Sequence, residues 1–193
     1  MFAPPKVRLL YFDLETKRSA DEVGGWNNIK NMGMACGVVY DSIEEKSFVY
    51  DEPQAKDLVR HLQRGDLIVG FNHVGFDYAV LSGYSDVQFN ALPSFDMLVD
   101  VTRLLGHRLK LDQLVTATLG DKKSADGMQS LKWVKEGKMD LVREYCKKDV
   151  EVTRRLFEYG SKEGRVYYFD RENEKIQLAV QWDISFLLSK VKR

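Results

Sequence analysis

Three short groups of residues along this chain have the chemistry needed to bind divalent metal ions. The first is Phe12-Asp13-Leu14-Glu15-Thr16, in which Asp13 and Glu15 are separated by one residue. Side chains alternate along a β-strand, so both carboxylates would point to the same face of a strand. Hard cations such as Mg²⁺ and Mn²⁺ prefer carboxylate oxygens. The pattern is compatible with a cation site, but on its own it more often marks a solvated strand end with no chemical role.

The second group is Asn72-His73-Val74-Gly75-Phe76-Asp77, which follows a short apolar run. We expect a strand to end near Asn72 and a helix to begin near Phe76. Ligands of α/β proteins bind where strands end and helices begin. Asp77 would then lie at such a position, although an acidic residue in a first helical turn is also stabilised by the helix dipole alone.

The third group lies in a helix predicted over residues 140–159. Apolar residues recur there with helical periodicity, and the predicted buried stripe is Leu141, Tyr145, Asp149, Val152 and Leu156. Asp149 is therefore expected in the middle of the buried face, with Tyr145 one turn earlier and within reach. A buried carboxylate needs a metal ion, a proton or an ion-pair partner. On this helix alone, a metal ion and a core arginine are equally good partners.

Taken together and in this order, D-x-E, N-x-x-x-F-D and Y-x-x-x-D resemble the motifs of the DEDD superfamily of 3′→5′ exonucleases. The resemblance extends over residues 7–158 and is to the tyrosine variant, because Tyr145 stands four residues before Asp149. The histidine variant would need a histidine five residues before that aspartate, where this chain has Glu144.

The resemblance implies a catalytic role for five residues and a two-ion metal centre. Four carboxylates would hold two Mg²⁺ or Mn²⁺ ions: Asp13, Glu15, Asp77 and Asp149. One ion would activate a water molecule, and the other would stabilise the leaving 3′ oxygen. The fifth residue, Tyr145, would orient that water, since a phenol with a pKa near 10 is a weak base.

The expected substrate is a nucleic acid with a free 3′ end, in single-stranded form. Leu14, Thr16, Asn72 and Phe76 adjoin the expected metal ligands and are predicted to contact the terminal nucleotide. Lys17 and Arg18 directly follow the acidic strand and could contact a phosphate. Trp26 lies in a glycine-bearing segment and could stack on a base, as aromatic residues of single-strand-binding proteins do.

The elements that must position these residues can be read from the apolar patterns. Strands are expected over residues 6–15, 35–40, 46–50 and 66–71, helices over 53–64 and from 76, and a loop around 24–28. Residues 94–98 fit either a strand or a helix entry, 99–160 are mostly helical, and 165–169 and 175–182 form a hairpin. The predicted class is α/β, with a mixed β-sheet flanked by α-helices and a C-terminal β-hairpin. The resemblance makes this fold ribonuclease H-like, in a single domain over residues 1–193 with residues 165–183 appended.

Composition restricts the class of protein. With 44% hydrophobic and 30% charged residues among 193, the chain has the composition of a globular protein. The formal net charge is zero, which argues against a protein that coats nucleic acid but not against an enzyme that holds one strand end. Its two cysteines form no disulfide framework, and no apolar run approaches the roughly 18 residues of a membrane span. No signal peptide is recognised at the start, and we expect a cytoplasmic protein without a membrane partner.

Two other functions fit the same fold. A non-catalytic ribonuclease H-like module could bind nucleic acid or dock a partner, but such a module has no need of four acids and a tyrosine. A ribonuclease H-like endonuclease or resolvase could carry a similar acidic centre, and the spacing of the second and third motifs favours the exonuclease. The sequence is compatible with either DNA or RNA as the substrate.

Overall fold

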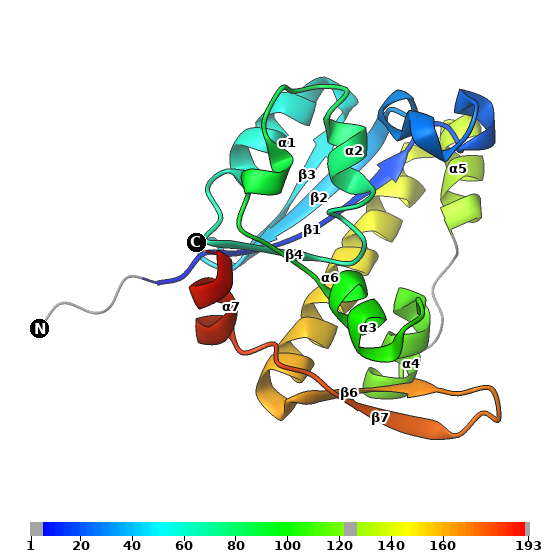
Figure 1. The fold of residues 1–193 in the computed structure, drawn as a ribbon. Coiled ribbons are helices and arrows are strands. Elements are labelled where there is room, and N and C mark those ends of the chain that lie inside the picture. Colours follow the sequence, from blue (N-terminus) through cyan, green and yellow to red (C-terminus); the bar gives the residue numbers. More distant parts are fainter. Residues whose placement is uncertain (1–5, 122–126, 192–193) are drawn as a thin grey trace, which may run out of the picture.

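The computed structural model describes residues 6–121 and 127–191. At its centre is a five-stranded mixed sheet in the order β3-β2-β1-β4-β5 (Figure 1). β1 is antiparallel to β2 and parallel to β4, and β5 continues the parallel part. The strands are β1 (Leu9–Thr16), β2 (Met34–Asp41), β3 (Lys46–Asp51), β4 (Leu67–Gly70) and β5 (Ser94–Asp96).

Strand β1 is covered on both faces, which explains its nearly continuous apolar sequence. Leu10, Phe12 and Leu14 point into one hydrophobic cluster. Leu9 and Tyr11 point into a second cluster on the opposite face. Since side chains alternate, Asp13 and Glu15 continue the face of Leu9 and Tyr11, as predicted.

Helices form a layer on each side of the sheet (Figure 1). The cluster beneath Leu10 and Phe12 is closed by α1 (Ala55–Leu62) and α2 (Asp77–Leu81). The opposite cluster is closed by α3 (Met97–Leu105), α4 (Leu111–Leu119) and the long α6 (Met139–Glu163). The short α5 (Gly127–Lys135) packs against α6 and β1. None of the helices within the described residues combines the length and hydrophobicity needed to cross a membrane.

The C-terminal region consists of a hairpin and one further helix. The hairpin strands are β6 (Arg165–Phe169) and β7 (Lys175–Ala179), and α7 spans Ile184–Val191. Between them, the Trp182 ring stacks on Phe157 of α6 with 6.2 Å between ring centroids and an interplanar angle of 9°. This contact joins the C-terminal segment to the core beside the sheet.

The predicted mixed sheet, flanking helices and C-terminal hairpin are confirmed, with differences in detail. The second hairpin strand ends at Ala179 instead of Trp182, and α7 was not predicted. The expected loop around 24–28 is mostly short 3-10 helix, in η1 (Asp21–Val23) and η2 (Trp26–Asn31). Residues 94–98 form the last strand and then the start of α3.

The predicted buried stripe of α6 is confirmed at its C-terminal end and wrong at its N-terminal end. Val152 and Leu156 are buried as predicted, but Leu141 is 46% exposed, and Val142, Cys146 and Val150 are buried in its place. Asp149 therefore lies at the edge of the buried face and not at its middle. The sequence contains apolar residues on both stripes, so periodicity alone could not decide which of them meets the sheet.

Candidate metal centre

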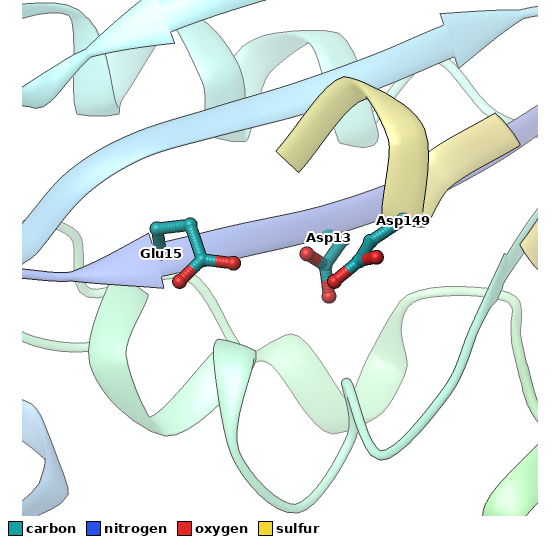
Figure 2. A group of neighbouring side chains, drawn as sticks. All are labelled: Asp13, Glu15 and Asp149. Carbon is teal, nitrogen blue, oxygen red and sulfur yellow. The ribbon is translucent and has the colours of Figure 1, made fainter. Parts of the chain in front are cut away.

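Three carboxylates from two elements converge at the end of β1. Asp13 and Glu15 come from β1 and Asp149 from α6, and Figure 2 shows the Asp13 and Asp149 carboxylates side by side with Glu15 on the same strand. Each contributes one oxygen to a group whose oxygens all lie within 4.8 Å of one another. All three side chains are partly exposed, so a cation could reach them from solvent.

The position of Asp149 follows from the packing of α6 across β1 and β2. Cys146 is buried, and its thiol lies 3.4 Å from the main-chain oxygen of Asp13 and 3.7 Å from a carboxylate oxygen of the same residue. Asp149 follows Cys146 by three residues, so it projects on a neighbouring part of the helix surface. A contact of α6 with the backbone of β1 thus places the third carboxylate beside the first.

The fourth predicted ligand, Asp77, is buried and contacts the backbone of β1. It is the first residue of α2, and its side chain is almost completely buried. One carboxylate oxygen accepts a hydrogen bond of 3.0 Å from the Leu14 N–H. Asp77 is not part of the group of three close oxygens, but its charge acts on Asp13 and raises the pKa of that carboxyl.

The electrostatics of the four acids favour a bound cation. Loss of solvent is the largest cause of the raised pKa of each, with values of about 8 for Glu15 and Asp77 and about 7 for Asp149. The pKa of Asp13 lies well above its ordinary value because of desolvation and then the charges of Asp77, Glu15 and Asp149. Ion pairs within the described residues involve none of these four carboxylates.

This set of donors fits a hard divalent metal. It is made of oxygen atoms alone, which suits Mg²⁺ or Mn²⁺ better than the softer metals that take thiolates. Acids gathered without lysine or arginine partners need positive charge or protons to offset their repulsion. A divalent cation supplies that charge and restores the ionised form of the carboxylates.

Tyr145 lies next to Asp149, as predicted from their spacing. Hydrogen bonding with Tyr145 lowers the pKa of Asp149, and burial, followed by the charges of Asp149 and Glu15, raises the pKa of the phenol. The phenol therefore stays protonated at neutral pH and can donate a hydrogen bond. The Trp133 ring of α5 meets the Tyr145 ring edge-on, with 6.2 Å between centroids.

The loop that carries Asn72 is held by an acid that is not part of the group. The Asp96 carboxylate accepts hydrogen bonds from the N–H groups of Asn72 at 2.8 Å, Val74 at 3.0 Å and Leu98 at 3.0 Å. Asn72 has a positive φ of 69°, and its side-chain oxygen accepts a hydrogen bond of 3.0 Å from Arg108. Asp96 thus connects the loop that precedes Asp77 to the start of α3 through hydrogen bonds.

A cavity of about 500 Å³ opens beside Glu15. Four of the predicted substrate contacts line it: Leu14, Thr16, Trp26 and Phe76. Two others, Lys17 and Asn72, do not line it. Lys17 forms an ion pair with Glu52 at 2.6 Å, and the Asn72 side chain accepts a hydrogen bond from Arg108. The Trp26 ring is 69% exposed and meets the Phe76 ring edge-on at 6.3 Å.

Sequence reasoning missed part of this cavity. Arg18 and Lys110 add positive charge to its lining, and α5 contributes the apolar side chains of Met128 and Leu131. Of these residues, Arg18 was expected near the substrate, because it follows the acidic strand directly. The residues of α5 gave no such signal, since they stand more than a hundred positions away from Glu15 in the chain.

Comparison with known proteins agrees with this fold. A family model described as RNase_H superfamily matches residues 10–161. The chain belongs to the ribonuclease H superfamily. Its predicted ribonuclease H-like fold is thereby confirmed, and superfamily membership together with the acidic group supports a nuclease function on nucleic acid with a divalent metal.

Solved structures show the same fold, and 82 chains match significantly. One is the family B DNA polymerase from the hyperthermophilic archaeon Pyrobaculum calidifontis, with 19% identity and a TM-score of 0.60. The match covers 83% of this ribonuclease H-like chain and 25% of the polymerase, so the chain spans about a quarter of the polymerase's length. No curated protein matches the sequence significantly.

Proposed function

We propose that this protein is a two-metal-dependent 3′→5′ exonuclease of the DEDD superfamily, in its tyrosine variant. The observation that carries the proposal is the convergence of Asp13, Glu15 and Asp149 within 4.8 Å, from two elements that are more than a hundred residues apart. Asp77 behind them and Tyr145 beside them complete the set of residues that the motifs indicate. A family model and the fold support a nuclease in general, and these five residues support the specific activity.

The four carboxylates would hold the metal, and the remaining chemistry belongs to side chains. A pair of Mg²⁺ or Mn²⁺ ions supplies, when bound, an activated water and charge to stabilise the leaving oxygen. Tyr145 would orient the attacking water through its phenol oxygen, since its raised pKa keeps the phenol protonated while the hydroxyl donates to Asp149. Asp77 keeps the α2 side of the site in place through its hydrogen bond to the β1 backbone.

The cavity beside Glu15 favours a single-stranded substrate. Its volume of about 500 Å³ is within the range of sites that hold small ligands, and suits an unstacked nucleotide. Trp26 offers an exposed ring on which a base could stack, and Arg18 and Lys110 could contact phosphates. A base within a duplex would first have to leave its stack to reach these side chains.

Digestion of end-labelled oligonucleotides tests the proposal. Single-stranded DNA and RNA, labelled at either end, are incubated with the protein and Mg²⁺ or Mn²⁺, and with the Asp13→Ala and Asp149→Ala proteins as controls. We expect mononucleotides to be released from 3′ ends, no cleavage of a circular strand, and loss of most activity in each variant, since the ligands of a metal centre act together. Cleavage of the circle would instead identify an endonuclease.

A protein that binds the oligonucleotides but degrades none of them, with either metal, would be a binding module. That outcome would overturn the proposed activity while leaving the fold and the superfamily unaffected. Near-normal activity in the Asp149→Ala protein would show that the acids near β1 are not the catalytic centre. The two failures are distinguishable in the same gel.

A further inference from the structure

Helix α5 presents two side chains to the candidate metal centre. Ser130 and Trp133 are three residues apart, so they lie on the same face of the helix. Ser130 is completely buried and adjoins Glu15, and the Trp133 ring adjoins the Tyr145 ring. One face of α5 therefore contacts both a predicted metal ligand and the predicted water-orienting residue.

The Ser130 hydroxyl has an unused capacity to donate a hydrogen bond. Its oxygen is buried and makes no hydrogen bond of regular geometry within the described residues. It nevertheless lowers the pKa of Glu15, as a donor facing a carboxylate does. Leaving a buried hydroxyl without a partner is costly, so this group is expected to find an acceptor, and the Glu15 carboxylate adjoins it.

Glu15 is a side chain that needs such support. It has more rotatable bonds than an aspartate, and it stands at the end of β1 where the register with β2 shifts between Glu15 and Thr16. The Ser130 hydroxyl adjoins Glu15 and has its hydrogen-bonding capacity still to use. A metal ligand on a flexible side chain binds well only if neighbouring groups hold it in place.

We propose that α5 is a positioning element of the catalytic centre, in which the Ser130 hydroxyl orients the Glu15 carboxylate and the Trp133 ring fixes the Tyr145 ring. The expected effects on catalysis rest on the proposed function, whereas the expected effect on Mn²⁺ binding at Glu15 can be tested without it. The competing explanation is packing alone, with serine chosen because a small residue lets α5 approach β1. The two explanations differ in what a missing hydroxyl does to metal binding.

The experiment compares the parent with Ser130→Ala, which keeps nearly the same volume and removes the donor, and with Ser130→Cys, which is somewhat larger and keeps only a weak donor. The Mn²⁺ affinity is measured by calorimetry without nucleic acid, and kcat and KM are measured with a single-stranded oligonucleotide. We expect Ser130→Ala to weaken Mn²⁺ binding by about 10–100-fold, the usual effect of losing a group that orients a ligand. KM for the oligonucleotide should stay the same at saturating Mn²⁺, and Ser130→Cys should fall between the two proteins.

Thr102→Val is the matched control, because the Thr102 hydroxyl is also buried without a partner within the described residues but belongs to α3. It should bind Mn²⁺ like the parent. Trp133→Ala should lower kcat without changing the Mn²⁺ affinity, whereas Trp133→Phe should restore most of kcat. Ser130→Ala or Ser130→Cys proteins with parental Mn²⁺ affinity would overturn the role of Ser130. A parent that binds Mn²⁺ but degrades no nucleic acid would refute the exonuclease, and the Mn²⁺ affinities would still decide the role of Ser130.

Discussion

The Leu14 N–H donates a hydrogen bond of 3.0 Å to the Asp77 carboxylate, joining the end of β1 to the first turn of α2. The reason lies in the length of β4, which pairs with β1 from Leu9 to Tyr11 and then ends. Beyond Tyr11, this edge of β1 lacks a neighbouring strand, and its N–H groups need other acceptors. Asp77 is thus a structural residue as well as a candidate metal ligand.

Two substitutions at Asp77 separate these roles. Asp77→Asn keeps an oxygen that can accept from Leu14 and removes a charge, so the metal-free protein should be at least as stable as the parent. Asp77→Ala leaves the buried N–H without an acceptor and should lower the free energy of unfolding by about 1–3 kcal/mol. Both should lose most nuclease activity. Denaturant melts and the oligonucleotide assay check this, and equal stability of the two variants would contradict the role given to the hydrogen bond.

The metal-free protein should become less stable as the pH rises from about 6 to 8. The folded-state pKa values of Asp149, at about 7, and of Glu15 and Asp77, at about 8, lie above those of unfolded carboxyls near 4. Groups shifted upward stabilise the folded state below the unfolded pKa, and this contribution is lost as pH rises through the folded pKa. Thermal melts in chelator should show Tm falling across this range.

Asp149→Asn is the control for that titration. It should melt higher than the parent in chelator at pH 8, and its Tm should fall less between pH 6 and 8. Excess Mn²⁺ should reverse the order by stabilising the parent by about 2.7 kcal/mol at a hundred times the dissociation constant. A parent without any response to Mn²⁺ would indicate that the acids do not form a cation site.

Removal of the Tyr145 hydroxyl should affect catalysis and leave the fold intact. Tyr145→Phe keeps the ring that meets Trp133, so Tm should be unchanged. If the phenol orients the attacking water, kcat should fall by about 10²–10⁴-fold with KM unchanged. Tyr168→Phe, in β6 of the hairpin, is the matched control and should be as active as the parent. A Tyr145→Phe protein with parental kcat would remove Tyr145 from the mechanism.

Much of the sheet and part of the site could be predicted from local patterns. Asp13 and Glu15 sit on one face because alternation along a strand is a local property, and Tyr145 and Asp149 are neighbours because they are one helical turn apart. Residues 99–160 were predicted to be mostly helical, and α3 and α4 end there at Gly106 and Gly120, in the left-handed conformation that glycine readily adopts. Each of these predictions depends on a few consecutive residues.

The features that could not be predicted depend on contacts between distant segments. The rotation of α6 about its axis depends on its packing against β1 and β2. From the sequence alone, either Leu141 or Val142 could have been the buried residue at its start. Ser130 gives no signal in the sequence, because its importance comes from facing Glu15 across a gap of more than a hundred residues. Trp182 was assigned to the hairpin, since nothing local revealed that it stacks on Phe157.

Removing the exposed ring of Trp26 should weaken the binding of single strands. Base stacking on an aromatic ring contributes about 1–3 kcal/mol per base, so Trp26→Ala should lower the affinity by that amount. The comparison is made by fluorescence anisotropy in the Asp13→Ala background, which prevents degradation of the labelled oligonucleotide. Val99→Ala removes another exposed apolar side chain that does not line the cavity, and it should bind like its background. Equal affinities for all three proteins would exclude Trp26 from the binding site.

Gly160 tests how the C-terminal segment is attached to the core. A Cβ atom at Gly160 would lie 2.2 Å from Cε3 of the Trp182 ring, far inside contact distance. Alanine favours a helix over glycine by roughly 1 kcal/mol, but overpacking a buried contact costs about 1–3 kcal/mol. Because the clash is with a ring that is itself stacked on Phe157, we expect the cost to prevail and Gly160→Ala to destabilise the protein.

The matched control is Gly127→Ala at the start of α5, where an added Cβ meets no atom within 4 Å. It should be neutral or slightly stabilising in the same denaturant melts. Trp182→Leu combined with Gly160→Ala should lose less stability than the sum of the two single changes, because the smaller side chain removes the clash. Strict additivity of the two changes would show that Trp182 does not pack against Gly160, and the C-terminal segment would then contact the core in another way.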